Sequence, residues 1–279
     1  MSNFGNDDLL IDEAGPWAKV KYRLVGMYNG IFSTGMKSKW DRRIYIDLFA
    51  GSGRVHIRGT NEIVDASPLL AMNVTAPYDL YILCERDPAK LSALRERVAR
   101  LYPHANVEYI LGDCNTHTAE LNKAIARSGS RNGGLSFCFA DPFGIGELKF
   151  ATIQSIGQGK AVDFLILLAL AMDANRFKTL YLRPSNRTVD EFLGNPRWRE
   201  AWAAVEPRMD FRRFLAEQYG QSMSGLGYLP VPLSKMKEVR SSEKNLPLYH
   251  LAFFSQHKLG YKFWDQVLKY GADQFELFD

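Results

Sequence analysis

Five apolar, strand-like runs alternate with helical segments over the first 170 residues, and this alternation constrains the fold more than any other feature of the chain. The runs are rich in β-branched and aromatic residues and end at turn residues: RIYIDLF, DLYILCE, VEYILGD, GLSFCFA and AVDFLILLAL. Strands joined through helices pair in parallel, and a parallel sheet is covered by helices on both faces. The sequence therefore predicts an α/β protein.

Helices are predicted between these runs, over 13–36, 67–74, 87–102, 116–128 and 150–156. Apolar residues repeat at helical spacing in the first of them: Val20, Leu24, Met27, Tyr28 and Ile31. In the second, Ser67 is the expected N-cap, with Pro68 in the first turn. An Asp-Pro pair opens the third in the same way.

The alternation stops after the fifth run. From Ala174 to Gly225 aromatic residues lie among arginines without a strand-like run, which predicts a helical insertion. Strands are expected again at 228–233 and 248–255, joined by the basic loop Ser234–Asn245, with a closing helix over 260–270. The predicted organisation is a seven-stranded, mostly parallel sheet in three parts: 1–173 with the N-terminal helix and core, 174–225 as the insertion, and 226–279 completing the core.

Composition places the chain among globular proteins. Of its 279 residues 46% are apolar and 24% charged, which is typical of a chain that buries a sizeable core. No apolar run reaches the ~18 residues of a membrane span, and the first residues lack the basic and apolar parts of a signal peptide. We therefore expect a soluble, cytoplasmic protein. Cys84, Cys114 and Cys138 lie far apart, so we expect reduced thiols near the core rather than a metal site or disulfides.

The basic excess is concentrated in one segment. Residues 174–244 hold 13 Lys and Arg against 8 Asp and Glu, whereas the whole chain carries a net charge of +4. Arginines beside Trp198, Trp202 and Phe211 suit phosphate contact and base stacking. They equally suit amphipathic helices whose aromatic residues are core, the interpretation that we favour. Substrate or partner selectivity is expected in this insertion and in the loop Ser234–Asn245.

The first strand ends in a glycine turn of the form D-x-F-x-G-x-G, with Asp47, Phe49, Gly51 and Gly53 at the fixed positions. A dinucleotide fingerprint needs a third glycine where His56 stands, and the Gly-Lys-Ser/Thr of a P-loop is absent from the sequence. Open α/β sheets bind ligands at the carboxyl ends of their strands. The glycines would let a ligand approach the backbone there.

Carboxylates end three successive strands. Asp47 could reach an ammonium or hydroxyl group, Glu85 could hold a ribose diol, and Asp113, beside Cys114, could accept from an exocyclic amine. Such a series without a phosphate motif favours a cationic nucleoside, S-adenosylmethionine. The alternative is that Asp47 caps a turn and that Glu85, with Asp87, only opens a helix.

The motifs YIDLFAGSG, YILCERDP, ILGDCN and FADPFG resemble those of class I methyltransferases. With ASPLLAM, ALAMDANRF, FLGNPRWREAW and LYHLAFFSQHKLG they resemble, in order and spacing, the three-Cys-motif partner (TcmP) family over nearly the whole chain. The resemblance implies a Rossmann-like methyltransferase fold, an S-adenosylmethionine site and a companion protein with a three-cysteine, radical-SAM-like motif. The three cysteines of this chain are not that motif.

The predicted catalytic segment is Asp141, Pro142 and Phe143, at the end of the fourth strand. It is similar to the D/N-P-P-Y motif of methyltransferases that modify amines of nucleic-acid bases. By that similarity, Asp141 would accept from the target amine and Phe143 would stack on the base. One proline instead of two, and Phe instead of Tyr, are departures from the motif, and a tight structural turn is the alternative.

Two further groups of polar residues follow predicted strands. Asp173, Asn175 and Arg176 follow the fifth strand and should emerge at the same edge as Asp141, where they would line an acceptor pocket or cap the next helix. His257 follows the last strand, which we expect to be antiparallel, so a structural role is favoured. Two functions stay open: a methyltransferase acting on a nucleic-acid amine, and a methyltransferase-like module that serves a companion enzyme.

Overall fold

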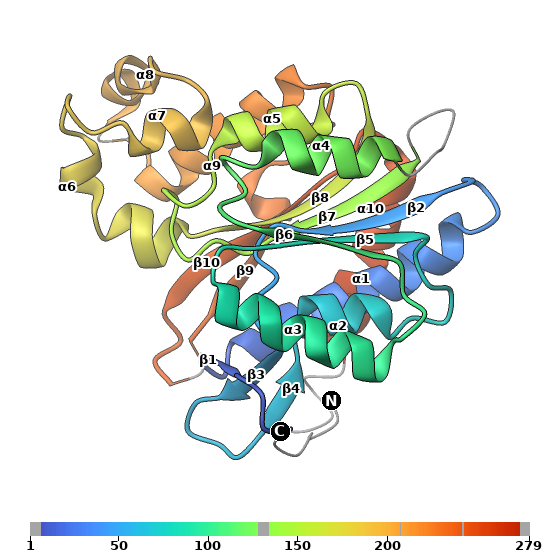
Figure 1. Ribbon diagram of the computed structural model, residues 1–279. Coiled ribbons are helices and arrows are strands. Elements are labelled where there is room, and N and C mark those ends of the chain that lie inside the picture. The colour runs from blue at the N-terminus through green and yellow to red at the C-terminus, as the bar shows by residue number, and fades with distance from the viewer. Residues whose placement is uncertain (1–6, 128–133, 207, 242, 274–279) are drawn as a thin grey trace.

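A seven-stranded sheet forms the centre of the computed structural model, which describes residues 7–127, 134–206, 208–241 and 243–273 (Figure 1). In spatial order the strands are β6 (Val107–Leu111), β5 (Leu80–Glu85), β2 (Arg43–Asp47), β7 (Leu135–Ala140), β8 (Ala161–Leu168), β10 (Pro247–Phe254) and β9 (Lys237–Arg240). β10 is antiparallel to both of its neighbours, and every other neighbouring pair is parallel.

Helices cover both faces of this sheet (Figure 1). One face carries α1 (Ala18–Met36), α2 (Ser67–Met72), α3 (Pro88–Leu101) and α10 (Lys258–Asp273), and the other carries α4 (Thr118–Arg127) and α5 (Phe150–Gly157). Tyr28 of α1 contacts Phe137 of β7 and Phe253 of β10, whose ring stacks on Trp264 of α10. The architecture confirms the predicted α/β fold, with a seven-stranded, mostly parallel sheet that helices cover on both faces.

In the segment predicted as a helical insertion, the residues that the structure describes form helices and connecting turns, without a strand. The helices are the end of η1 (Leu170–Asn175), α6 (Lys178–Tyr181), α7 (Thr188–Leu193), α8 (Trp198–Val205) and α9 (Phe211–Gly225). Trp198, Trp202 and Phe211 are at most 3% exposed, so their rings are core and are not available to stack on a base. Tyr219 of α9 contacts both Phe150 and Phe254, which joins this cluster to the core of the sheet.

The sixth strand lies later in the sequence than expected. The predicted strand at 228–233 is wrong: this stretch is irregular and runs into the short 3-10 helix η2 (Leu233–Lys235). Pro230 and Pro232 cannot donate to a ladder, which explains why the stretch does not pair. The strand at this edge is β9, inside the predicted basic loop, and it forms a hairpin with β10.

A second, small sheet was not expected. It consists of β1 (Asp12–Ala14), β3 (Arg54–Ile57) and β4 (Ile63–Asp65), with β1 parallel to β3. The predicted start of the first helix at Glu13 is therefore wrong, and α1 begins at Ala18.

Two helix ends also need comment. The N-cap of α2 is Ala66 rather than Ser67, although Pro68 does lie in the first turn as expected. The predicted helix end at Ser128 lies outside the described residues.

The three cysteines lie in the interior, as expected for thiols near the core. All three are buried and free, and Cys84 and Cys138 lie within the central strands. None of the helices in the described part of the chain is both long and apolar enough to cross a membrane.

Candidate functional site

A cavity of about 340 Å³ lies at the carboxyl ends of β2, β5, β6 and β7, the edge at which open α/β sheets bind ligands. Eight of the residues predicted for the site line it: Phe49, Gly51, Glu85, Asp113, Cys114, Asp141, Pro142 and Phe143. Six carboxylate and four basic side chains contribute to the lining, so its formal charge is negative. The structure therefore brings the ends of four successive strands into one concave site.

The glycine turn adopts the backbone that its sequence predicts. Gly51 has φ +61 and Gly53 has φ +88, in the left-handed region that favours glycine. A Cβ on Gly53 would lie 2.8 Å from Leu94 Cδ1 of α3, so this glycine permits helix packing and does not line the cavity. Gly51 does line it, and its N–H donates to Glu85 Oε2 at 2.8 Å.

Asp47 lies beneath the turn and does not face the cavity. Its side chain is fully buried and accepts from the Tyr45 hydroxyl at 2.8 Å, the Phe49 N–H at 3.2 Å and the Ser67 hydroxyl. Burial raises the pKa of Asp47 to about 6. The expected direct contact of this carboxylate with an ammonium group is corrected: Asp47 shapes the turn, as the alternative interpretation proposed. Ser67 is occupied by this contact, which explains why its side chain does not cap α2.

Replacing Asp47 with asparagine should change how stability depends on pH. The folded-state pKa of about 6 lies above the ordinary carboxyl value of 3.8, so the native state binds more protons between these pH values and the contribution of Asp47 to the free energy of unfolding falls as pH rises through them. Relative to Asp47→Asn, the wild type should lose up to about 3 kcal/mol of its free energy of unfolding between pH 4 and pH 7. Denaturant unfolding of both proteins across this range measures the difference. Parallel profiles would contradict the shift.

Glu85 and Asp113 form a carboxylate shelf on the neighbouring strands. Glu85 is half-buried and accepts the Gly51 N–H through one oxygen and the Asp87 N–H, at 2.9 Å, through the other. Each oxygen keeps a second lone pair for a ligand. Asp113 is exposed and accepts from Asn115 through Oδ1. The Cys114 thiol is buried, and burial raises its pKa to about 12, so it contributes a neutral wall.

Asp141, at the end of β7, forms an ion pair with Lys21 of α1. The exposed fractions of the two side chains are 18% and 10%. Burial, the largest single influence, lowers the pKa of Lys21, but the neighbouring acidic groups, Asp141 foremost, together outweigh it and hold that pKa above its ordinary value. The sequence analysis missed this residue. Its signal is position, because Lys21 precedes the buried Val25 and Tyr28 by four and seven residues, on the buried face of the helix.

Tyr249, near the start of β10, completes this end of the cavity. Its side chain is 3% exposed and lines the cavity, and burial raises the pKa of its hydroxyl well above the ordinary value. Among the residues that the structure describes, none forms a hydrogen bond with that hydroxyl.

The rest of the predicted catalytic segment lies at the rim. Pro142 is buried, whereas the Phe143 side chain is 74% exposed and its N–H donates to Glu147 Oε2 at 2.9 Å. Glu147 also forms an ion pair with Arg86 at 3.3 Å. An exposed aromatic ring at the mouth of a polar cavity is an available stacking surface.

Asp173 holds the turn that follows Phe143. It accepts from the Ile145 N–H and from the Tyr181 hydroxyl, both at 2.6 Å, and so ties this turn to the insertion. It does not belong to the lining of the cavity, and neither do Asn175 and Arg176, which are exposed. The predicted acceptor-pocket role of these three residues is therefore corrected.

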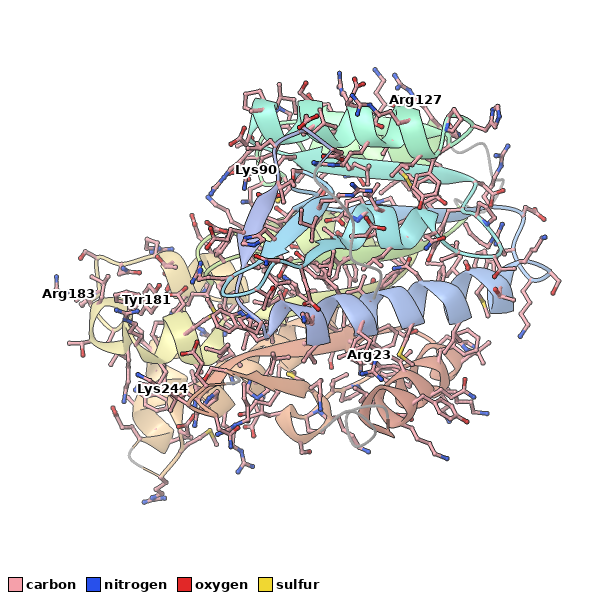
Figure 2. All side chains as sticks on the ribbon, turned by 90° about the horizontal axis from the view of Figure 1, so that it is seen from below. Arg23, Lys90, Arg127, Tyr181, Arg183 and Lys244 are labelled. Atoms are coloured by element: carbon pink, nitrogen blue, oxygen red, sulfur yellow. The ribbon has the colours of Figure 1, made fainter. Side chains whose placement is uncertain are left out.

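One basic residue of the insertion and one of the β9–β10 hairpin lie at the same end of the molecule (Figure 2). Figure 2 shows Arg183 of the insertion and Lys244 of the β9–β10 hairpin at the same end, with Arg127 of α4 far from both.

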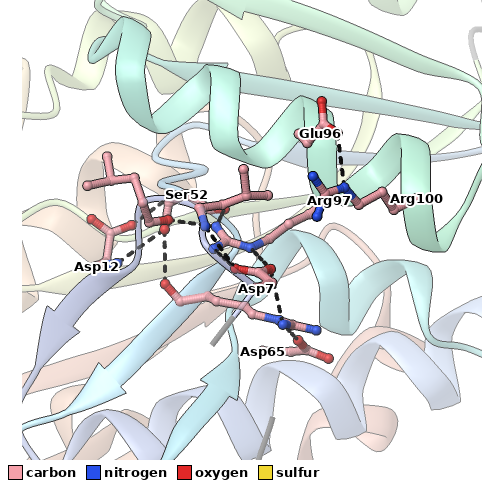
Figure 3. Close-up of polar contacts among 10 residues, drawn as sticks. Asp7, Asp12, Ser52, Asp65, Glu96, Arg97 and Arg100 are labelled. Atoms are coloured by element: carbon pink, nitrogen blue, oxygen red, sulfur yellow. Dashed lines mark hydrogen bonds and ion pairs between the residues drawn. The ribbon is translucent and has the colours of Figure 1, made fainter. Parts of the chain in front are cut away.

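The residues 7–17, which we call the N-terminal strap, form one wall of the cavity. The buried Arg97 of α3 anchors the strap: its guanidinium donates to Asp7 at 2.7 and 2.8 Å, to the Leu10 carbonyl at 2.7 Å and to the Ser52 carbonyl at 2.6 Å (Figure 3). Asp12 accepts the Ser52 N–H at 2.7 Å and pairs with Lys90 at 2.6 Å. One arginine therefore joins the strap to the glycine turn.

His257 lies at the opposite edge of the sheet, where the antiparallel β10 ends. Its Nδ1 accepts the Leu259 N–H at 3.1 Å and its own N–H donates to Ser255 Oγ at 3.1 Å. The contacts secure the start of α10, in agreement with the structural role that we favoured.

No protein-family model and no curated protein match the chain. Among solved structures, it is similar to Trm1 from Pyrococcus horikoshii, in complex with S-adenosyl-L-methionine, at 11% identity and a TM-score of 0.46 over 96% of this chain and 64% of that one. TYW2 from M. jannaschii, in complex with AdoMet, is 12% identical with a TM-score of 0.38, over 82% of this chain and 77% of TYW2. Protein LPL1258 from Legionella pneumophila is 14% identical with a TM-score of 0.39, over 52% of this chain and 67% of LPL1258. The chain spans less than two thirds of the length of Trm1, and likenesses of this strength do not establish a common function.

Proposed function

We propose that this protein is an S-adenosylmethionine-dependent methyltransferase that acts on an amine of a nucleic-acid base, and that it belongs with the TcmP-like proteins its motifs resemble. The observation that carries the proposal is the shared cavity, in which Glu85 and Asp113 lie with the Asp141–Phe143 segment. Glu85 and Asp113 stand at the ends of β5 and β6, where a nucleoside would bind, and the segment follows β7, where the acceptor amine would lie.

The residues present fit this cofactor. The negative formal charge of the lining suits a sulfonium cation, and Glu85 retains a lone pair on each oxygen for a ribose diol. Asp113 accepts from Asn115 through Oδ1 only, so its other carboxylate oxygen can accept a hydrogen bond from the adenine amine. Asp12 lies beside Gly51, but its carboxylate already accepts the Ser52 N–H and pairs with Lys90, so it shapes this wall of the cavity and is not a free partner for the methionine part.

When bound, the cofactor supplies an electrophilic methyl carbon, to which the acceptor nitrogen's lone pair forms a bond while the electron pair of the breaking S–C bond stays on sulfur. Asp141 would accept an N–H of the acceptor amine, which orients the lone pair and offers an oxygen for the proton that the nitrogen releases. Phe143, exposed at the rim, would stack on the base.

Binding of the cofactor is the step on which this proposal depends. We expect micromolar affinity for S-adenosylmethionine and for S-adenosylhomocysteine in calorimetric titrations. Glu85→Gln should weaken both by about 1–3 kcal/mol, because it removes a charge-assisted contact. The matched control is Glu120→Gln, an exposed carboxylate on α4, which should bind like the wild type. Wild-type affinity in Glu85→Gln, with its fold intact by thermal unfolding, would reject the assignment of the ribose position.

We also propose the association with a three-cysteine companion protein that the motif resemblance implies. Phe177 and Leu180, beside and on α6, are 44% and 42% exposed and give the insertion an apolar surface suited to docking. In this second function the cavity would bind the cofactor while the companion performs its own chemistry.

A further inference from the structure

Three polar groups meet at the acceptor end of the cavity: the Lys21 ammonium, the Asp141 carboxylate and the Tyr249 hydroxyl. They come from α1, from the end of β7 and from the start of β10. Lys21 and Asp141 are in contact, and both interact electrostatically with Tyr249. Only Asp141 was expected here from the sequence.

The Tyr249 hydroxyl is the first sign that this end is built for a ligand. A buried polar group without a partner costs about 1–3 kcal/mol, so proteins rarely keep one without a reason. The buried hydroxyls of Tyr219 and Tyr228 also lack a hydrogen-bond partner in the described part of the chain, but only that of Tyr249, which is 3% exposed, lines the cavity. A polar atom of a bound molecule would satisfy it.

The ion pair narrows the chemistry of that molecule. Together Lys21 and Asp141 carry no net charge, so neither a protonated amine nor a carboxylate gains a net attraction here. What the pair presents is a hydrogen-bond donor beside an acceptor. Its complement is a neutral edge on which an N–H donor adjoins an acceptor atom.

We propose, on the basis of the function proposed above, that this trio selects an amine carried by a ring carbon next to an unprotonated ring nitrogen. Asp141 accepts from the amine, Lys21 donates to the ring nitrogen, and Tyr249 bonds to a further polar atom of the same edge. Adenine and cytosine present such an edge. Uracil and thymine have no exocyclic amine. Guanine places an N–H beside its amine on the Watson–Crick edge and offers an unprotonated nitrogen, N3, only on the other side of the amine, so adenine and cytosine alone present the required pair on the Watson–Crick edge.

The ring nitrogen itself provides the test. Transfer of labelled methyl from S-adenosylmethionine is measured on single-stranded oligonucleotides containing adenine, 1-deazaadenine or 7-deazaadenine, and cytosine or 3-deazacytosine, with uracil as the base without an amine. For the base that is methylated, removing the adjacent nitrogen should lower kcat/KM about 10–100-fold, the effect of losing a hydrogen bond to a charged group. The 7-deaza base keeps that nitrogen and should react like adenine.

Variants then assign the contact to its residue. Lys21→Met keeps the length of the side chain without a donor, and it should methylate the normal and the deaza base at the same reduced rate. Tyr249→Phe should raise KM for the oligonucleotide while the affinity for S-adenosylmethionine stays unchanged. Thermal unfolding of both variants verifies the fold, and the comparison of bases on wild-type protein stands without them.

The outcomes separate this inference from the proposed function. Equal methylation of normal and deaza bases by the wild type would overturn the inference and leave the methyltransferase in place. Discrimination that persists in Lys21→Met would reject Lys21 as the donor. Cofactor binding without labelling of any base would overturn the proposed acceptor class and, with it, the inference.

Discussion

Asp141→Ala is expected to lower methyl transfer by a factor of about 10²–10⁴ while S-adenosylmethionine still binds, because a single positioning contact to one of two substrates is lost. Alanine removes both carboxylate oxygens, whereas asparagine, which the D/N-P-P-Y motif also carries, would keep an acceptor for the amine. The Lys21 ammonium loses its partner in this variant, so thermal unfolding verifies the fold. The assay is transfer of labelled methyl to mixed DNA, RNA and protein pools, with and without a three-cysteine companion protein.

The matched control for this variant is Glu13→Gln. Glu13 also lines the cavity, but it pairs with Arg58 where both side chains are more than half exposed, so its loss should change transfer little. Equal labelling by wild type and Asp141→Ala would keep an enzyme and reject Asp141 as the residue that orients the acceptor. Wild-type protein that binds the cofactor and a companion tightly, yet labels none of the pools, would favour the module.

Gly51→Val is expected to weaken cofactor binding by about 100-fold or more, equivalent to about 2.8 kcal/mol. Gly51 has φ +61 and a Cβ there would lie 2.8 Å from Asp12 Oδ2, so the larger side chain can be accommodated only by moving the strap or by filling the cavity. Calorimetric titration with S-adenosylmethionine measures the loss.

Gly59→Val separates this crowding from backbone strain. Gly59 also has positive φ, +78, but a Cβ there meets nothing within 4 Å. Both variants carry the cost of a β-branched residue in the left-handed region, about 1–2 kcal/mol, and only Gly51→Val should lose the ligand. Similar affinities in the two variants would place the cofactor away from the glycine turn.

The central strands could be predicted from the sequence because strands buried on both faces consist of continuous apolar runs. Asp47, Glu85 and Asp113 were located at one edge for the same reason, since parallel strands end together. β9 escaped detection because it is an edge strand of four residues in which only Val239 is buried. The apolar stretch before it resembled a strand, but its two prolines prevented pairing.

The acceptor end of the cavity could be predicted only in part. A strand-end position identified Asp141, but Lys21 and Tyr249 lie within regular elements, and their role depends on how α1 and β10 pack beside β7. Asp47 and Asp173 show the opposite kind of error, because strand-end positions in the sequence placed them in the site and the structure does not. Both are occupied by neighbouring N–H and hydroxyl groups, which sequence spacing does not reveal.

The distribution of Lys21, Asp141 and Tyr249 along the chain bears on when the site comes into existence during synthesis. Lys21 leaves the ribosome early, but Asp141 is 120 residues away and Tyr249 follows still later. Domains begin to fold while the chain is still growing, so a nascent chain can assemble its first strands around a cavity whose far wall does not yet exist. A translation product that stops within the insertion would carry the glycine turn and Asp141 without Tyr249. Methyl transfer would then report on completed chains, because the last-made strand supplies the final wall of the acceptor end.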